Sequence, residues 1–319
     1  MERTCIYGPV ASRRFGLSLG VDLLPGKVCS YNCVYCQVGE TEELTAKRRD
    51  FFSLENILRQ VKEALEQGPE PDVITLAGSG EPTLYRSLGP LITELKRLAH
   101  KPVLLITNGS LFHDEDVVGA ALLADIVAPS LDAPDEKTFL AINRPSADVT
   151  FDRMVHGLER FCARYQGECR LEVMLVDGIN TSTEQLEAFR RLLDRMACSK
   201  IDVNTPIRPG WNKAVGPCDE PLLEQACGIF GPRAGIIASF PGSWRESYDR
   251  QTAVERIEAR ILALLARRPC TIPDLATSLV LDRQVIEEAV RSMVSRGRIE
   301  ARPGIGEPYF TATTEGRST

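Results

Sequence analysis

Apolar and polar positions follow two alternating periods along the first three quarters of the chain. Short apolar runs typical of strands buried on both faces occur at residues 17–24, 72–78, 102–109, 125–132, 170–176 and 200–206. Segments with apolar residues at helical spacing lie between them, at 53–68, 87–99, 112–123, 150–163 and 183–196. This order predicts parallel βα units. We therefore expect an α/β fold, a partial (β/α)6 barrel, with residues 235–242 trailing along its edge.

The pattern changes near residue 253, where three helical segments precede two short strands around a Pro-Gly turn. This order is typical of a winged helix, which often places its second helix, here 282–296, in a nucleic-acid groove. Between residues 252 and 312, nine arginines face eight acidic residues, whereas strong phosphate binders carry more positive charge. The sequence therefore leaves two kinds of partner for this domain, RNA and protein. The predicted boundaries are a barrel at 1–240, a linker at 241–252 and a winged helix at 253–319.

Composition narrows the class of protein. Of 319 residues, 43% are hydrophobic and 26% charged, the net charge is −6, and no apolar run approaches the roughly 18 residues of a membrane span. The first residues also lack the apolar core of a signal peptide. We therefore expect a cytoplasmic protein without a membrane partner. Ten cysteines in such a chain favour reduced thiols and metal chemistry over disulfides.

Three cysteines lie close together in the run CSYNCVYC: Cys29, Cys33 and Cys36, with Tyr35 before the last. Soft thiolates on so short a loop converge on one thiophilic centre, for which iron–sulfur clusters and zinc are the usual candidates. A closed zinc site needs a fourth ligand, and Cys5 is available. An open position is instead what a catalytic centre keeps for its reactant. Three cysteines at looser spacing allow either a second cluster or buried apolar packing: Cys198, Cys218 and Cys227.

Polar residues follow nearly every predicted strand. In a barrel the reactive groups collect at the C-terminal ends of the strands, so these positions are candidate ligand contacts rather than simple turn residues. The glycines of the GSGEP run allow close backbone approach, and the Glu81 carboxylate suits a ligand ammonium. The strand-end candidates are Gly78, Ser79, Gly80, Glu81, Thr107, Asn108, Ser130, Asp132, Asn180 and Asn204.

Arginines and asparagines also gather at the expected barrel mouth. A guanidinium binds phosphate or carboxylate through two parallel hydrogen bonds, which favours an anionic substrate group. Each arginine alone also fits a surface or interdomain salt bridge. The candidate substrate residues are Arg13, Arg14, Asn143, Arg144, Asn204 and Arg208.

The spacing C-x3-C-x2-C, with an aromatic residue before the third cysteine, resembles the signature of radical S-adenosylmethionine (SAM) enzymes. The resemblance implies that Cys29, Cys33 and Cys36 hold a [4Fe–4S] cluster, with SAM on the fourth iron. It also implies that Tyr35 lies against the adenine, and GSGEP resembles the GGE motif with Ser79 in place of a glycine. The positions that it implies for the SAM carboxylate and ribose are Thr107, Asn108, Ser130 and Asp132, with Asn180 as a further cofactor contact.

This resemblance implies an activity: reductive cleavage of SAM to methionine and a 5′-deoxyadenosyl radical, with flavodoxin or ferredoxin as electron donor. The branch labelled wyosine-synthase-like (tRNA imidazoguanosine synthetase-like) is similar over roughly residues 6–240, in the runs GPVASRRFGLSLGVDL, CSYNCVYCQ, GSGEPTL, SLDAPDEKTFLAINRP and TPIRP. That similarity implies RNA base modification, although relatives there carry a second cluster and only Cys5 precedes the triad here. The alternatives are radical modification of a protein or small metabolite, and a non-catalytic SAM-sensing regulator.

Overall fold

The computed structural model describes residues 4–12, 14–207, 210–238, 257–258, 260–262, 264–265, 269–279, 281–303 and 307–313. Arg13, Arg208 and the linker predicted at 241–252 lie outside these residues. The chain forms two compact units. The larger contains Met1–Gly8, Leu19–Glu66 and Val73–Ser247, and the smaller contains Pro9–Ser18, Gln67–Asp72 and Tyr248–Thr319.

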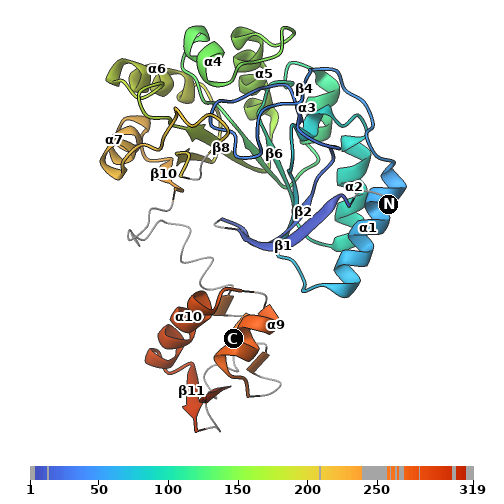
Figure 1. Cartoon of the computed structure of the whole chain (residues 1–319), viewed down its shortest axis with the longest axis vertical. Helices are drawn as coiled ribbons and strands as arrows, with labels where there is room; N and C mark the ends of the chain where they lie inside the picture. Colours follow the sequence, from blue (N-terminus) through green and yellow to red (C-terminus); the bar gives the residue numbers. More distant parts are fainter. Residues whose placement is uncertain are drawn as a thin grey trace. The chain divides into compact units, whose positions relative to one another are not determined.

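An eight-stranded sheet in the order β1-β2-β5-β6-β7-β8-β9-β10 is the main feature of the fold (Figure 1). Its strands are β1 (Ile6–Ser12), β2 (Gly16–Val21), β5 (Val73–Leu76), β6 (Val103–Thr107), β7 (Ile126–Pro129), β8 (Glu168–Met174), β9 (Lys200–Asn204) and β10 (Ala234–Ile236). From β5 to β10 every neighbouring pair is parallel. The predicted partial (β/α)6 barrel is therefore confirmed, and β10 lies along its edge as expected.

Helices cover one face of this sheet, as an arc outside the strands in Figure 1. They are α1 (Leu54–Gln67), α2 (Leu88–Ala99), α3 (Glu115–Ala121), α4 (Glu136–Ile142), α5 (Phe151–Arg164), α6 (Thr183–Leu193) and α7 (Glu220–Phe230). Short elements complete this part: β3 (Val28–Cys29), β4 (Glu43–Leu44) and the 3-10 helix η1 (Pro82–Leu84). The sequence pattern predicted α1, α2, α3, α5 and α6 but not α4 or α7.

Local sequence explains where these elements begin and how they pack. Helix α6 starts at a capping box in which the Ser182 hydroxyl accepts from the Gln185 amide and the Gln185 side chain accepts from the Ser182 amide. All four residues of β5 are buried, as expected of a strand covered on both faces. Between helices and sheet, Phe112 stacks on Phe161 with ring centroids 4.3 Å apart. The apolar core thus fixes the strands, and with them the loops at the strand ends.

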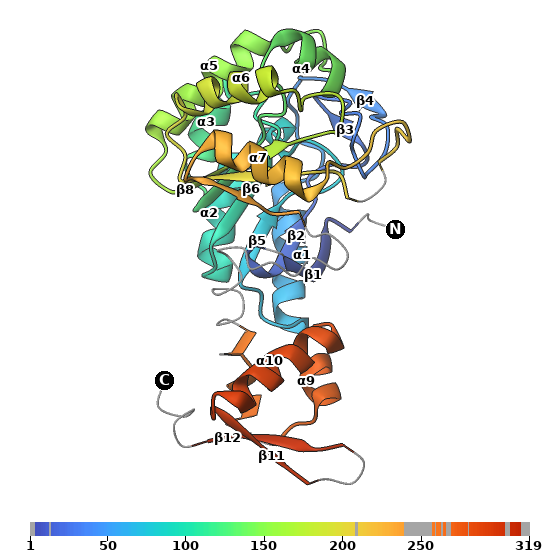
Figure 2. The ribbon, with the colours of Figure 1, turned by 90° about the vertical axis from the view of Figure 1, so that its left-hand side faces the viewer.

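The C-terminal part of the chain has its own small core. Helices α9 (Ile272–Leu279) and α10 (Arg283–Ser295) lie side by side, next to the antiparallel strands β11 (Ile299–Arg302) and β12 (Tyr309–Ala312) (Figure 2). Four of the buried residues between them are Leu275, Ile286, Met293 and Phe310. Among the residues that the structure describes, no helix has the length and apolar character to cross a membrane.

Candidate functional site

The cysteine loop lies at the C-terminal end of β2, where strand β3 pairs in parallel with β4. Cys29 is buried at the end of β3, and its carbonyl accepts from the Thr45 amide at 2.9 Å. Cys33 and Cys36 are half-buried, and the Cys36 amide donates to the Cys33 carbonyl at 3.1 Å. The loop therefore holds three thiols on one compact turn.

Each of the three thiols accepts a hydrogen bond from a different nitrogen. Asn108, at the end of β6, donates from Nδ2 to Cys29 Sγ at 3.6 Å. Asn143, which ends α4, donates from Nδ2 to Cys33 Sγ at 3.4 Å. Lys27, just before β3, donates from Nζ to Cys36 Sγ at 2.9 Å. Such donors stabilise thiolate sulfur and tune the metal group that it binds.

The donor set, three thiols that each accept an N–H donor, fits an iron–sulfur cluster. Among the residues that the structure describes, no three His, Cys, Asp or Glu side chains converge as ligands of one ion. A [4Fe–4S] cluster does not require its cysteines to converge on one ion, because each of them binds a different iron. Cys5, the fourth ligand of the zinc alternative, instead contacts α1, where Gln60 Nε2 donates to its Sγ at 3.9 Å.

Burial also bears on what these thiols do. It raises the pKa of Cys29 to about 11, and it raises the pKa of Cys33 further. At neutral pH such thiols do not ionise unaided, so they are poor nucleophiles. A coordinated metal deprotonates a thiol outright, which suits these side chains as metal ligands.

Tyr35 and Asp132, two predicted cofactor contacts, meet in the structure. The Tyr35 hydroxyl donates to Asp132 Oδ2 at 2.5 Å, and Asn143 Nδ2 donates to the same oxygen at 2.9 Å. Asp132 Oδ1 accepts from the Met174 amide at 3.2 Å. Burial raises the pKa of Asp132 to about 6, although these hydrogen bonds oppose the shift. The carboxylate thus fixes Tyr35 from the end of β7.

Close packing explains the two glycines of the GSGEP run. A Cβ on Gly78 would lie 2.3 Å from Asp22 Cγ, and a Cβ on Gly80 would lie 1.8 Å from the Val28 carbonyl oxygen. Between them, the amide and the hydroxyl of Ser79 donate to Asp22 Oδ2 at 3.1 and 2.5 Å. The run is therefore pressed against the end of β2 and the start of the cysteine loop.

The buried Glu81 carboxylate connects the ends of β5 and β6. Its Oε1 accepts from the Thr83 amide at 3.0 Å and from the Thr83 and Thr107 hydroxyls at 2.6 Å each. Its Oε2 accepts from the Asn108 amide at 2.7 Å. Burial raises the pKa of Glu81, and these hydrogen bonds oppose the shift. Donors of the chain thus occupy the acceptor sites, and a direct contact to a ligand ammonium stays a prediction.

Asn180 and Ser130 stabilise the strand ends through the backbone. Asn180 is fully buried, its Nδ2 donates to the carbonyls of Asp132 and Met174 at 2.8 Å each, and its Oδ1 accepts from the Val176 amide at 2.7 Å. All its polar atoms therefore bind the protein itself. The Ser130 amide donates to the Thr107 carbonyl at 3.0 Å, which joins the ends of β6 and β7.

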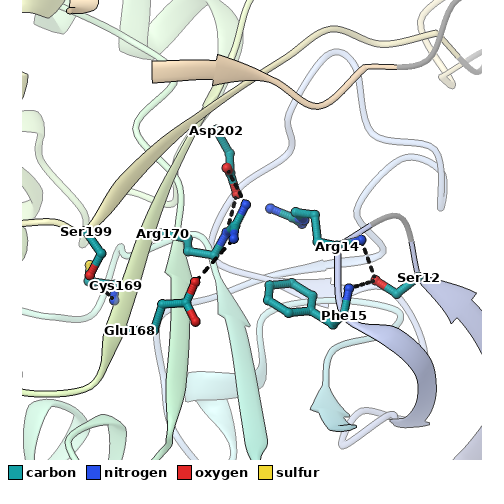
Figure 3. Close-up of polar contacts among 8 residues, drawn as sticks. All are labelled: Ser12, Arg14, Phe15, Glu168, Cys169, Arg170, Ser199 and Asp202. Carbon is teal, nitrogen blue, oxygen red and sulfur yellow. Dashed lines mark hydrogen bonds and ion pairs between the residues drawn. The ribbon is translucent and has the colours of Figure 1, made fainter. Parts of the chain in front are cut away.

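Charged side chains line one face of β8 and β9. The alternate residues Leu171, Val173, Ile201 and Val203 belong to the apolar core, so Arg170, Glu172, Asp202 and Asn204 lie on the opposite face. Arg170 donates from Nε and Nη2 to the two oxygens of Asp202, both at 2.9 Å (Figure 3). Asn204 Nδ2 donates to Glu172 Oε1 at 3.0 Å. This face is polar although nearly closed to solvent.

Among the predicted substrate residues, Asn143 and Arg144 lie against the cysteine loop, and the Asn32 amide donates to the Asn143 carbonyl at 2.9 Å. The Arg144 guanidinium lies 5.5 Å from the centre of the Trp211 ring. Trp211 in turn donates from Nε1 to the Cys33 carbonyl at 2.9 Å. Arg14 lies on a separate turn, where its amide donates to Ser12 Oγ at 3.3 Å (Figure 3).

Sequence reasoning missed Lys27, Asp22 and Trp211. Lys27 stands two residues before the first cysteine of the triad, and a cation so close to predicted thiolates was an available signal. Trp211 is separated from the loop by more than 170 residues, so only the fold reveals it.

The remaining cysteines also group differently from the sequence-based suggestion. Cys162 and Cys169 have sulfurs 3.8 Å apart. Their hydrogen bond and burial raise the pKa of Cys169, and the nearby Cys198 adds a smaller increase. Arg233 Nη1 donates to Cys198 Sγ at 3.3 Å. Cys218 lies elsewhere, with its amide bound to Thr205 Oγ1 at 2.8 Å.

Comparisons with known proteins agree with this site. The family model described as the radical SAM superfamily matches residues 23–193. A UPF0026 protein of Methanocaldococcus jannaschii is 32% identical over 98% of this chain and 98% of its own length. A protein of Brachyspira hyodysenteriae named GTPase Obg is 35% identical over 92% of this chain, which spans 43% of that protein. The present sequence contains no G-x-x-x-x-G-K-S/T phosphate-binding motif.

Among solved structures, a radical SAM methyltransferase from Sphaerobacter thermophilus has a TM-score of 0.54 and 20% sequence identity. The match covers 70% of this chain and 67% of that one, and it supports the fold. Together with the cysteine triad at the strand ends, these matches show that the protein is a radical SAM superfamily enzyme of the UPF0026 group, with a [4Fe–4S] cluster and SAM as its cofactors.

Proposed function

We propose that the cluster is held by Cys29, Cys33 and Cys36, and that the enzyme removes a hydrogen atom from a polar substrate bound at the strand ends. One observation carries this proposal: the three thiols share one loop at the C-terminal ends of the strands, and each accepts its own N–H donor. When bound, the cluster and SAM supply reductive cleavage to methionine and a 5′-deoxyadenosyl radical.

The residues around the loop then orient and enclose the cofactor. Asp132 fixes the Tyr35 hydroxyl at 2.5 Å, so the tyrosine ring is held beside the cysteine loop for contact with the adenine. Glu81 fixes the Asn108 amide at 2.7 Å, and with it the side chain that reaches Cys29. We assign these two carboxylates to orientation of the cofactor contacts rather than to proton transfer. Fixed groups of this kind hold a ligand in a reactive geometry.

The substrate side is proposed to be the polar face of β8 and β9. Arg170, Glu172, Asp202 and Asn204 supply both charges and amide groups there. Even a paired buried charge, such as Arg170 with Asp202, contributes little net stability, so a polar face inside a barrel is more easily explained by a polar ligand than by packing alone. Asn143, Arg144 and Arg14 are proposed to add contacts nearer the barrel mouth.

We further propose that the substrate is an RNA base, as in the wyosine-synthase-like branch, and that residues 253–319 form a winged helix that binds the RNA. The supporting observation is the order of α9, α10 and the antiparallel β11–β12 pair. In this reading α10 is the helix that approaches the nucleic acid. Its exposed Arg291 is the candidate phosphate contact.

A second candidate, modification of a protein or small metabolite, is favoured by the charges of the same domain. Arg283 pairs with Glu287 at 2.8 Å and with Glu307 at 3.2 Å. Arg296 and Arg298 both pair with the buried Glu258. Arginines engaged in this way have less charge to offer to phosphate.

Anaerobic turnover separates the two candidates. Yield of 5′-deoxyadenosine from the full chain is measured with total tRNA or with an RNA-free metabolite extract. The RNA proposal predicts that tRNA stimulates the wild-type enzyme and that Arg291→Glu abolishes this stimulation. The control is Arg153→Glu, an equal charge change at an exposed position of α5, which should keep the stimulation. Stimulation by the extract alone, equal in both variants, would favour the second candidate.

The electron donor is proposed to be flavodoxin or ferredoxin, because such a cluster needs a low-potential reductant. A cytoplasmic location is proposed with it. All ten cysteines are free thiols in the structure, as expected of a reducing compartment.

A further inference from the structure

Lys27 places a buried cation against the proposed cluster loop. The residue is 8% exposed, and its Nζ lies 2.9 Å from Cys36 Sγ. Within the described part of the chain, this sulfur is the hydrogen-bond acceptor of the ammonium group. A buried ammonium is costly without an anionic partner. When Cys36 binds the cluster, its metal-bound thiolate would supply that partner.

The other two thiols have neutral donors. Cys29 accepts from the Asn108 amide group at 3.6 Å, and Cys33 accepts from the Asn143 amide group at 3.4 Å. Burial raises the pKa of Cys29, the Lys27 ammonium lowers it, and Glu81 raises it by a smaller amount, whereas burial and then Asp132 raise the pKa of Cys33. The Lys27 charge thus acts on Cys29 as well as on Cys36, and its hydrogen bond is to Cys36.

The backbone holds Lys27 in this position. Its carbonyl accepts from the amides of Glu42 and Glu43 at 3.0 and 3.2 Å. The next residue, Val28, pairs with Glu43 in the short β3–β4 ladder. The base of the side chain is therefore fixed directly before the short strand that carries Cys29, next to the cysteine loop.

We propose that Lys27 is a positioning residue that raises the reduction potential of the cluster by holding its ammonium against the Cys36 thiolate. The potential of an iron–sulfur cluster depends on its net charge and on hydrogen bonds to its sulfurs. Reduction adds one negative charge to the cluster, and a fixed cation stabilises the more negative state. The inference rests on the proposed cluster ligands. It adds a role for the Lys27 ammonium, which makes the cluster easier to reduce.

Redox titration followed by electron paramagnetic resonance tests this role in the full chain. The variants are Lys27→Met, which keeps most of the side-chain volume without the charge, and Lys27→Arg, which keeps the charge. Iron per chain and SAM affinity are measured on the same samples. We expect wild-type iron and SAM affinity in Lys27→Met, with the equilibrium constant for reduction at least about tenfold lower, a shift of about 59 mV to more negative potential. Lys27→Arg should stay near the wild-type potential.

An unchanged potential in an iron-loaded Lys27→Met protein would overturn the inference while leaving the cluster assignment intact. Weaker SAM binding at an unchanged potential would also overturn it, and would assign the ammonium to the SAM carboxylate instead. Wild-type protein that takes up no iron would refute the proposed ligands themselves. If Lys27→Met does not load iron, Lys27→Gln, which keeps an N–H donor without the charge, carries the same comparison.

Discussion

Gly80 couples the end of β5 to the cysteine loop, and replacing it with alanine tests that coupling. The new Cβ would lie 1.8 Å from the Val28 carbonyl oxygen and 2.7 Å from Leu24 Cδ1. Real Cβ atoms essentially never come closer than 3.0 Å, so residue 80 and the Val28 carbonyl must move apart by at least 1.2 Å, the difference between these distances. The obstacle is backbone rather than the end of a flexible side chain, so it cannot simply rotate away.

Two losses follow from this displacement. Overpacking in a dense interior costs about 1–3 kcal/mol of unfolding free energy. Val28 directly precedes Cys29, so the same shift moves a proposed cluster ligand, and misplacement by about 1 Å can cost about 10²-fold in rate. We therefore expect Gly80→Ala to be less stable by about 1–3 kcal/mol, to hold less iron, and to cleave SAM about 10²-fold more slowly.

The assay is anaerobic urea unfolding followed by circular dichroism, with iron per chain and 5′-deoxyadenosine yield from the same preparations. The matched control is Gly119→Ala on α3, where a Cβ would meet nothing within 4 Å. That change should stabilise the protein by about 0.5–1 kcal/mol, because alanine favours the helix. Wild-type stability and iron content in Gly80→Ala would refute the tight packing of this loop.

Two further predictions concern buried charges. The raised pKa of Asp132, about 6 against an ordinary 3.8, means that its protonated form stabilises the fold. This contribution to the free energy of unfolding is complete below about pH 3.8 and is lost as the pH rises through 6. Across that window the wild-type protein should therefore lose about 3 kcal/mol of unfolding free energy relative to Asp132→Asn. Urea unfolding of the apoprotein measures this difference. Arg170→Met should cost about 3–5 kcal/mol, because it breaks the buried ion pair with Asp202. Adding Asp202→Leu should restore most of this loss, and an equally unstable double variant would contradict the pairing.

Much of the barrel could be predicted because its signals are local. Buried strands such as Val73–Leu76 are continuous apolar runs, and the helices between them have clear periods and caps. Helix α7 was missed although Asp219 caps it and Pro221 stands in its first turn, because the predicted barrel ended at its sixth strand. The triad was also local, since its three cysteines fall within eight residues.

The roles of the strand-end residues could not be predicted in the same way. A glutamate after a Gly-rich turn reads as a ligand contact, but only the folded structure shows that the Glu81 oxygens are occupied by Thr83, Thr107 and Asn108. Trp211 and Arg144 meet the cysteine loop from distant segments. Such contacts depend on how the strands are ordered in the sheet. Residue patterns along the chain do not predict these individual long-range contacts.

The most direct test of the account is to count metal in anaerobically reconstituted wild-type and Cys33→Ala protein and to record spectra of the reduced samples with and without SAM. We predict about four irons and four sulfides per wild-type chain, a paramagnetic signal that changes when SAM is added, and loss of both in Cys33→Ala. One zinc per chain without iron, or an intact cluster that still responds to SAM in Cys33→Ala, would contradict the assignment of the cysteine loop.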